Sequence, residues 1–420
     1  MKEKKKVKLD RVSEDALIAG IDIGKRKHYC RFINSRGYEL GKVFSFSNNR
    51  DGMEKVINTI EKVKKQNNLK KVAIGVEPSG HYWKAAAYYL QDRGYTLALV
   101  NPYHVKKIKE IEDNCQTKTD IKDCLLVAKL VRDGNYFNPN LTYGIYAELQ
   151  RLSRLRLKIK KSYIREKIKL RTLLDEYFPE YENIFYDVLG ASSIYILKNY
   201  FLPEALAKEN ILGLASAINT ISRGKIKIAR VLKLASMARE SIGITSATGT
   251  ALLEKDYILG QIEDLKGKLA DITIKIKQYL KGIEHSQYLL SIPGVGPIIA
   301  AGFLGEVGDI SNYSNSNEII KLAGLNLVEI SSGIKKGRKK ISKRGNSFLR
   351  LTLYQCAVVA IAKNSQIKSY FVSRTKTKNK MKMLVAVQCK LVRIMFALLK
   401  HKKYYDPKEV EKHIFAEAAA

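Results

Sequence analysis

The sequence has little of what marks membrane, secreted or zinc-binding proteins. No apolar stretch reaches the roughly 18 residues that a spanning helix needs. Met1–Lys8, with its five lysines, leads into no signal-type apolar segment. The five cysteines are odd in number, scattered and without paired spacing, which argues against a disulfide framework and a zinc site. We therefore expect a cytosolic protein with no membrane association.

Acidic residues are scarce beside basic ones. The 420 residues include 41 Asp and Glu against 75 Lys and Arg, a formal net charge of +34. Such an excess is costly in self-repulsion unless a polyanion is present, and it spreads along the chain instead of forming one tail. We expect a nucleic-acid partner, and a chain of this length should divide into two or three domains.

Four of the scarce acids stand where a metal site would need them. Asp22 ends the apolar run 17–21 and Glu77 ends the run 72–76, and both runs are rich in β-forming residues. Asp120 and Asp123 are three positions apart in a segment that a Thr or Asp can cap as a helix, which predicts both on one helix face. Taken singly, each acid is more often a turn residue or a partner of a helix dipole.

The order of the expected elements favours a shared site over four separate roles. Three strands are expected within 17–48, with a tight connection at 35–37, then a helix near 52–66, a strand at 71–77, a helix near 80–93, a strand at 95–100 and helices from about 104. Right-handed crossovers would place the fourth strand beside the first, so Asp22 and Glu77 become neighbours in a ribonuclease-H-type mixed sheet. His28 and His81 lie near acidic positions, although solvated or capping roles are commoner.

Clustered carboxylates require a neutralising cation. Oxygen-only ligands select hard cations, and two-metal sites suit phosphoryl transfer. We therefore expect Mg²⁺, with Mn²⁺ as a substitute, at Asp22, Glu77, Asp120 and Asp123.

Two long helices are expected in the middle of the chain. Residues 145–178 predict a long basic helix, and the stretch 180–250 predicts short helices without a chemical signal. In a further helix, apolar residues alternate in steps of four and three, which is typical of a coiled-coil seam: Ile258, Ile262, Leu265, Leu269, Ile272, Ile276 and Tyr279. An amphipathic helix packed on its own domain is the alternative.

The last third contains two candidate nucleic-acid contacts. Residues 291–297, with Gly294 and Gly296, are similar to the turn of a helix-hairpin-helix, whose backbone N–H groups can hold a phosphate; a plain helix–helix turn is the alternative. Farther on, Ser331-Ser332-Gly333 precedes a cationic segment containing Lys335, Lys336, Arg338, Lys339, Lys340, Lys343 and Arg344. That pattern is compatible with a nucleophile beside a phosphate clamp. By itself Ser-Ser-Gly is a common flexible loop, and a plain phosphate-binding loop is the commoner case for the basic run.

Together these motifs resemble the DEDD-type transposases of a large family of bacterial insertion sequences, which includes RNA-guided serine recombinases. The N-terminal carriers are 20–25, 76–80, Asn101-Pro102 and 118–123; the C-terminal carriers are 292–297, 323–325, Ser332-Gly333, 342–346 and Leu349-Arg350. The resemblance covers nearly the whole chain, although the segment 180–250 is longer than in compact members.

The resemblance implies an α/β plus α architecture in three parts. These are a RuvC-like, RNase H-like domain at 1–140, a helical coiled-coil connector at 141–285, and a mostly helical C-terminal transposase domain at 286–420 with a helix-hairpin-helix-like motif. It places the chain in the bacterial cytosol or nucleoid.

The resemblance also implies a mechanism and partners. It implies a DNA transposase in which Ser332, with Ser331 as the near alternative, forms a covalent bond to DNA beside the metal-holding acids. Donor and target double-stranded DNA, a guide RNA, and a homodimer or homotetramer with the helix 258–279 as its contact are the expected partners. A RuvC-type endonuclease that uses water is the second function, and a non-catalytic nucleic-acid scaffold ranks last.

Overall fold

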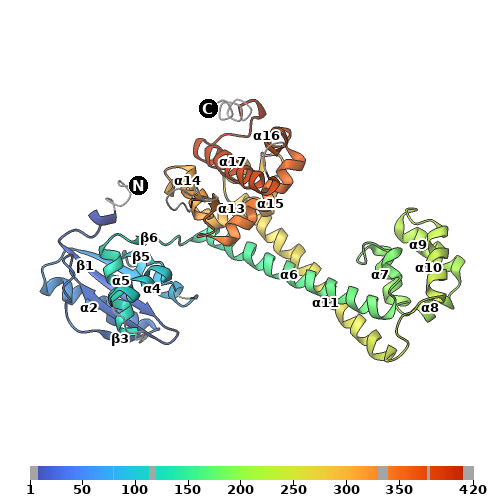
Figure 1. The fold of residues 1–420 in the computed structure, drawn as a ribbon, viewed down its shortest axis with the longest axis horizontal. Helices are drawn as coiled ribbons and strands as arrows, with labels where there is room; N and C mark the ends of the chain where they lie inside the picture. Colours follow the sequence, from blue (N-terminus) through green and yellow to red (C-terminus); the bar gives the residue numbers. More distant parts are fainter. Residues whose placement is uncertain (1–7, 79, 113–119, 330–338, 376–378, 410–420) are drawn as a thin grey trace, which may run out of the picture. The chain divides into compact units, whose positions relative to one another are not determined.

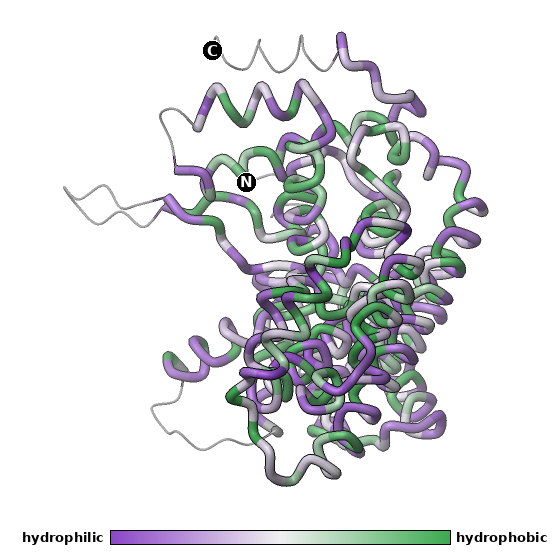
Figure 2. Tube along the Cα trace, turned by 90° about the vertical axis from the view of Figure 1, so that its right-hand side faces the viewer, coloured by the Kyte–Doolittle hydropathy of each residue, from purple (hydrophilic) through white to green (hydrophobic). Residues whose placement is uncertain are grey.

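The chain folds into two compact units, residues 1–141 and 142–420, and we describe each by itself (Figure 1). The computed structural model describes residues 8–78, 80–112, 120–329, 339–375 and 379–409. Along the tube in Figure 2, hydrophobic and hydrophilic residues alternate within single helices, as expected for helices that bury one face.

The first unit is built on a six-stranded mixed sheet with the order β3-β2-β1-β4-β5-β6. Its strands are β1 (Ala16–Ile23), β2 (Lys27–Ile33), β3 (Phe44–Ser47), β4 (Lys71–Val76), β5 (Thr96–Val100) and β6 (Tyr136–Phe137). Strand β1 pairs antiparallel with β2 and parallel with β4, with Gly20 opposite Gly75 and Ile21 opposite Val76. The predicted neighbourhood of the first and fourth strands is confirmed. The short β6, antiparallel to β5, was not predicted.

Helices cover both faces of this sheet, which gives three layers. They are α2 (Arg50–Gln66), α3 (Trp83–Gln91), α4 (Pro102–Glu112) and α5 (Asp120–Arg132). Because successive strand residues face opposite sides, Leu17 and Ala19 of β1 belong to the core under α2 and α3. Ile18 belongs instead to the core under α4 and α5.

Helix α5 lies directly on the backbone of β1 and β4. A Cβ atom on Gly20 would come within 1.9 Å of the Cys124 carbonyl oxygen and 2.7 Å of the Ala128 nitrogen. One on Gly75 would come within 2.6 Å of Val131 Cγ2. The two glycines are register partners, so together they open the sheet surface that the helix occupies.

The second unit is helical apart from a two-stranded hairpin in its described part. Its helices are α6 (Gly144–Tyr177), η1 (Tyr181–Asn183), α7 (Ala191–Asn199), α8 (Pro203–Ala207), α9 (Ile211–Ser222), α10 (Ile228–Arg239), α11 (Thr248–Lys281), α12 (Ser286–Leu290), α13 (Pro297–Val307), η2 (Ile310–Asn312), α14 (Ser316–Leu322), α15 (Ser347–Lys363), α16 (Ser365–Thr375) and α17 (Lys380–His401). The hairpin strands are β7 (Leu327–Val328) and β8 (Lys340–Ile341).

Helices α6 and α11 lie side by side and run antiparallel (Figure 1). The start of α6 and the end of α11 share one apolar core with α12–α17. The end of α6 and the start of α11 share another core with α7–α10. The predicted long basic helix and the predicted short helices in 180–250 are both present.

The predicted seam of α11 faces a helix of its own chain. Ile258, Ile262, Ile272 and Ile276 are buried, and the helix that α11 contacts most extensively is α6. Near its end the seam passes from Tyr279, which is exposed, to the buried Leu280, because an α-helix drifts relative to a strict heptad. The apolar spacing in 258–279 therefore corresponds to a helix pair within one chain. It no longer supports the expected contact between subunits through this helix.

The close approach of α5 predicts an intolerant position. Gly20→Ala should lower the free energy of unfolding by about 3 kcal/mol, because the added methyl meets the backbone of α5 and not a flexible side chain. Gly260→Ala is the matched control, since that glycine lies within α11 with open space around it and should be neutral or slightly stabilising. Urea unfolding of both variants measures the difference; equal stabilities would contradict the packing argument.

Candidate active site

Asp22 and Glu77 lie at the ends of neighbouring parallel strands. Asp22 follows Ile21 near the end of β1, and Glu77 directly follows Val76, the partner of Ile21 in β4. Asp22 stands two positions after Gly20, so strand alternation directs it to the sheet face that carries α5. Both acids are half-buried. The sequence expectation that these two acids are neighbours agrees with the register.

Helix α5 brings further candidates to the same face. It begins at Asp120 and carries Asp123 one turn later, so the predicted helix over both acids is present. The pKa of the Cys124 thiol is raised to about 12, chiefly by burial; the positive charge of Arg31 opposes this shift and the negative charge of Asp22 adds to it. Asp22 is thus within electrostatic reach of the residue next to Asp123. Cys124 stays a neutral thiol at physiological pH.

Asp123 has a lysine partner. Its Oδ1 lies 2.7 Å from the Lys109 Nζ of α4, and only 14% of the aspartate side chain and 20% of the lysine side chain are exposed. Within the described ranges, no three His, Cys, Asp or Glu side chains gather closely enough to hold a metal ion. The side chain of Asp120 lies outside what is described. The structure therefore brings Asp22 and Glu77 together and sets α5 beside them, but it does not show the predicted four-acid cluster.

The two histidines mentioned with these acids have other surroundings. His28 is fully buried and is the register partner of Ile23, so it faces the core under α2 and α3 and not the face of Asp22. Its ring packs edge-on against Phe46 at 5.0 Å, and burial lowers its pKa. His81 is exposed, and its ring lies tilted by 39° against the ring of Tyr82 with the centroids 4.3 Å apart.

The hairpin β7–β8 flanks the candidate serine segment in the sequence. Ser331, Ser332, Lys335, Lys336 and Arg338 lie outside the described residues. The flanks are held by backbone bonds: the Ser342 N–H donates to the Asn326 carbonyl at 2.8 Å, and the Lys343 N–H to the Gly324 carbonyl at 2.9 Å. The described basic candidates on this arm are all exposed: Lys339, Lys340, Lys343 and Arg344.

The glycine turn before α13 joins two helices, as predicted. Gly294 has φ +95, and a Cβ atom there would come within 3.0 Å of the Ala360 backbone, so the turn packs closely on α15. Gly296 is the N-cap of α13 and has open space around its Cβ position. A phosphate role for this turn stays a prediction.

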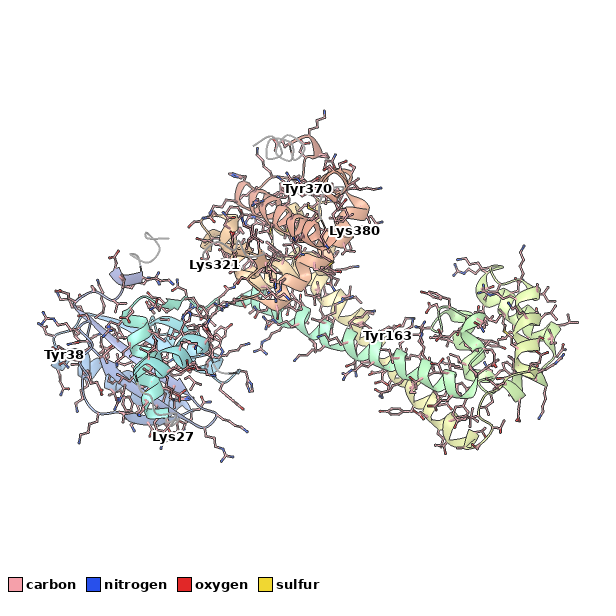
Figure 3. All side chains as sticks on the ribbon, in the orientation of Figure 1. Lys27, Tyr38, Tyr163, Lys321, Tyr370 and Lys380 are labelled. Carbon is pink, nitrogen blue, oxygen red and sulfur yellow. The ribbon has the colours of Figure 1, made fainter. Side chains whose placement is uncertain are left out.

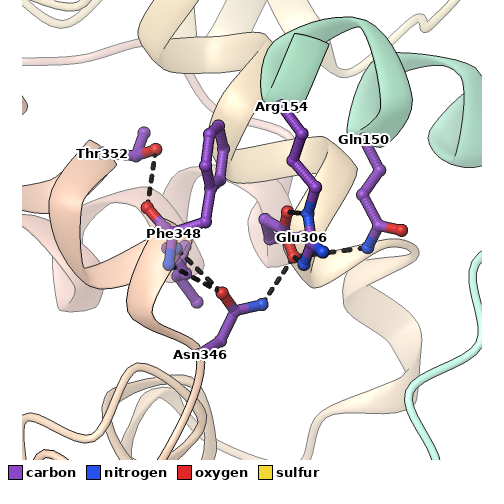
Figure 4. Close-up of polar contacts among 7 residues, drawn as sticks. Gln150, Arg154, Glu306, Asn346, Phe348 and Thr352 are labelled. Atoms are coloured by element: carbon purple, nitrogen blue, oxygen red, sulfur yellow. Dashed lines mark hydrogen bonds and ion pairs between the residues drawn. The ribbon is translucent and has the colours of Figure 1, made fainter. Parts of the chain in front are cut away.

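A buried carboxylate that the sequence analysis missed links three parts of the second unit (Figure 4). Glu306 of α13 is fully buried. Arg154 of α6 donates from Nε and Nη2 to its two oxygens, the latter at 2.8 Å, and this contact raises the arginine pKa. Gln150 donates at 3.3 Å, and the Asn346 amide donates to Oε2. A lone acid in the apolar segment 297–307 was the signal available in the sequence.

Asn346 connects this carboxylate to the basic segment. While its amide nitrogen donates to Glu306, its Oδ1 accepts from the N–H groups of Phe348 and Leu349 at 3.0 Å and caps α15. Its own N–H donates to the Leu322 carbonyl at 2.6 Å. Glu306 therefore holds α6, α13 and the start of α15 in one arrangement.

Removing Arg154 should show how much the buried charge of Glu306 destabilises the fold when it is unpaired. Arg154→Ala leaves Glu306 buried without its main donor and should destabilise the chain by about 3 kcal/mol. Lys268→Ala removes an exposed i, i+4 pair with Asp264 and should cost less than about 0.5 kcal/mol. Combining Arg154→Met with Glu306→Leu should recover most of the loss, because no unpaired charge remains. Denaturant unfolding of the three variants tests this; a double variant as unstable as Arg154→Ala would refute it.

The strand order and the acids define a class of domain. A mixed sheet in the order 3-2-1-4-5, with acids ending its first and fourth strands, is consistent with the ribonuclease-H-like domains of enzymes that act on phosphodiesters. Residues 19–179 match a family described as a transposase. Residues 286–372 match the family described as the transposase IS116/IS110/IS902 family. The chain belongs to this family of insertion-sequence transposases, and Asp22, Glu77 and Ser332 fall within the matched ranges.

Named relatives agree with this assignment. A 44.8 kDa protein of insertion element IS116 from Streptomyces clavuligerus is 24% identical over 94% of this chain and 97% of its own length. The transposase for insertion sequence element IS1328 of Yersinia enterocolitica is 38% identical over 24% of this chain and 29% of its own. The pilin gene-inverting protein of Moraxella bovis is 23% identical over 92% of this chain and 97% of its own. Among the helices that the structure describes, none has the length and apolar character that a bilayer crossing demands.

Proposed function

We propose that this transposase cuts and rejoins DNA with Ser332 as nucleophile, assisted by a divalent cation held by Asp22, Glu77, Asp120 and Asp123. The observation that carries the proposal is the pairing of β1 with β4, which ends in two adjacent acids on the side of the sheet occupied by α5. Two carboxylates side by side repel each other, and a bound cation would offset that cost.

The chemistry of these side chains fits a hard cation. All four candidates offer carboxylate oxygens, the ligands that Mg²⁺ prefers and Mn²⁺ accepts. When bound, the cation would polarise a phosphodiester and neutralise charge on its oxygens. The Lys109 ammonium is paired with Asp123, so a cation bound at Asp123 would take the place of this positive charge.

Attack by a serine exchanges one phosphate ester bond for another, so the strands can be rejoined without a further energy source. The Oγ of Ser332 would bond to phosphorus while the bond from phosphorus to one sugar oxygen breaks, and a sugar hydroxyl would reverse the exchange when strands rejoin. The basic residues from Lys335 to Arg344 would hold the phosphate. A relative named for inverting a pilin gene supports rejoining and not cutting alone. Hydrolysis by water at the acids, as in a RuvC-type endonuclease, is the second candidate.

The charge distribution supports polyanionic partners. The net charge of +34 exceeds what a chain of this size carries comfortably alone, and Figure 3 shows side chains with nitrogen tips projecting from both units. Donor and target DNA are the partners proposed on this basis. A guide RNA and a homodimer or homotetramer rest on the family resemblance.

A trapped adduct separates the two candidate functions. After incubation with end-labelled DNA and Mg²⁺, denaturing electrophoresis should show label on the protein, because a serine attack leaves DNA covalently attached. Ser332→Ala should abolish the adduct and recombination, whereas Ser331→Ala should be much milder. Free nicked DNA without protein-linked label would favour hydrolysis, and an adduct mapped to Ser331 would move the nucleophile by one residue.

Loss of an acid should separate cleavage from binding. Glu77→Gln should reduce strand cleavage by more than the roughly 10- to 100-fold typical of outer-shell changes at metal sites. DNA affinity should be nearly unchanged, since it rests on Lys and Arg. Asp51→Asn is the control, an exposed acid in the first turn of α2. Cleavage assays and gel shifts read the two properties; full cleavage by Glu77→Gln would remove this residue from the site.

A further inference from the structure

An exposed tyrosine is held in a fixed position near the C-terminal end of α17. Tyr404 is 58% exposed. Its ring packs edge-on against Tyr288 of α12, which is only 9% exposed, with ring centroids 5.1 Å apart. Tyr404 therefore combines an accessible ring with a defined orientation.

The residues on either side of Tyr404 fix the backbone that follows α17. Lys402 has φ +53 and ends α17. The Tyr405 N–H donates to the Ser291 Oγ at 2.9 Å. The Asn364 amide, buried between α15 and α16, donates to the Tyr405 hydroxyl at 2.9 Å. Ser291 is the first residue after α12 and opens the turn that contains Gly294 and Gly296, so Tyr404 stands beside the candidate phosphate-binding turn.

Lysines precede this tyrosine along the chain. Lys400, Lys402 and Lys403 are exposed, as is His401 between them. The nearest acid that follows, Asp406, accepts a hydrogen bond from the Lys408 N–H at 2.8 Å. The surface thus joins an oriented aromatic ring with several exposed lysines.

We propose that Tyr404, with Lys402 and Lys403, is a stacking platform for an unpaired base of a single-stranded nucleic acid. Every base offers a π face, so stacking on tyrosine is tolerant of sequence, while lysines hold the phosphates on either side. Bases within a duplex already stack on one another and offer no free face. DNA and RNA share this chemistry, and the proposal depends neither on Ser332 nor on the carboxylates.

Binding at raised salt isolates the stacking contribution, because phosphate contacts weaken steeply with salt. With dye-labelled oligothymidine and oligouridine, Tyr404→Ala should lower affinity about tenfold, the size expected for one stacked base. Tyr404→Phe should bind like the wild type. Tyr257→Ala is the matched control: this tyrosine of α11 is 63% exposed and adjoins Asp256 instead of a cationic run. Thermal unfolding of each variant confirms that the fold is retained.

Two further measurements locate the contact. Replacing Lys402 and Lys403 by Gln should reduce the slope of log affinity against log salt by about 1.4. Photo-crosslinking with 5-iodouracil oligonucleotides should attach the base to Tyr404. Comparing DNA and RNA oligomers identifies which strand the platform prefers. The proposal is overturned if Tyr404→Ala binds single strands like the wild type, if it weakens duplex binding equally, or if crosslinks map elsewhere.

Discussion

The absence of side chains at Gly20 and Gly75 is the constraint on which the first unit depends. Because these residues are register partners in β1 and β4, they clear one continuous area of backbone, and α5 occupies it at contact distance. A larger residue at either position would lift the helix and with it Asp123. The same two strands position the acids, because Asp22 is the second-last residue of β1 and Glu77 directly follows β4. The packing at the two glycines therefore fixes the sheet, the helix and the candidate acids together.

Most of this unit could be predicted from local pattern. Apolar runs ending in acids gave the strands, and the crossover rule gave the neighbourhood of Asp22 and Glu77. The pairing of Asp123 with Lys109 could not be predicted, because it depends on how α4 and α5 meet, and no spacing along the chain encodes that angle. The two-residue β6 was too short for any periodicity to reveal it.

In the second unit, periodicity identified helices but not their partners. The seam of α11 looks the same in sequence whether its partner is another subunit or α6, since both offer an apolar groove. Glu306 is a related case. Its role depends on Arg154, more than 150 positions away, and on Asn346. A lone acid in an apolar helix does not indicate which donors will bind it. The role expected for Ser332 rests on the resemblance, because Ser-Ser-Gly is also the pattern of a common flexible loop.

The antiparallel arrangement of α6 and α11 has a consequence for the order of folding. As the chain leaves the ribosome, α6 is synthesised well before α11. Until α11 follows, the apolar face of α6 that contacts it stays exposed. The helices α7–α10 lie between them in sequence and form a core with the end of α6 and the start of α11. That core can close the intervening loop early, which reduces the chain entropy still to be lost. Helices α7–α10 would then act as a folding nucleus, from which the pairing of α6 with α11 extends toward α12.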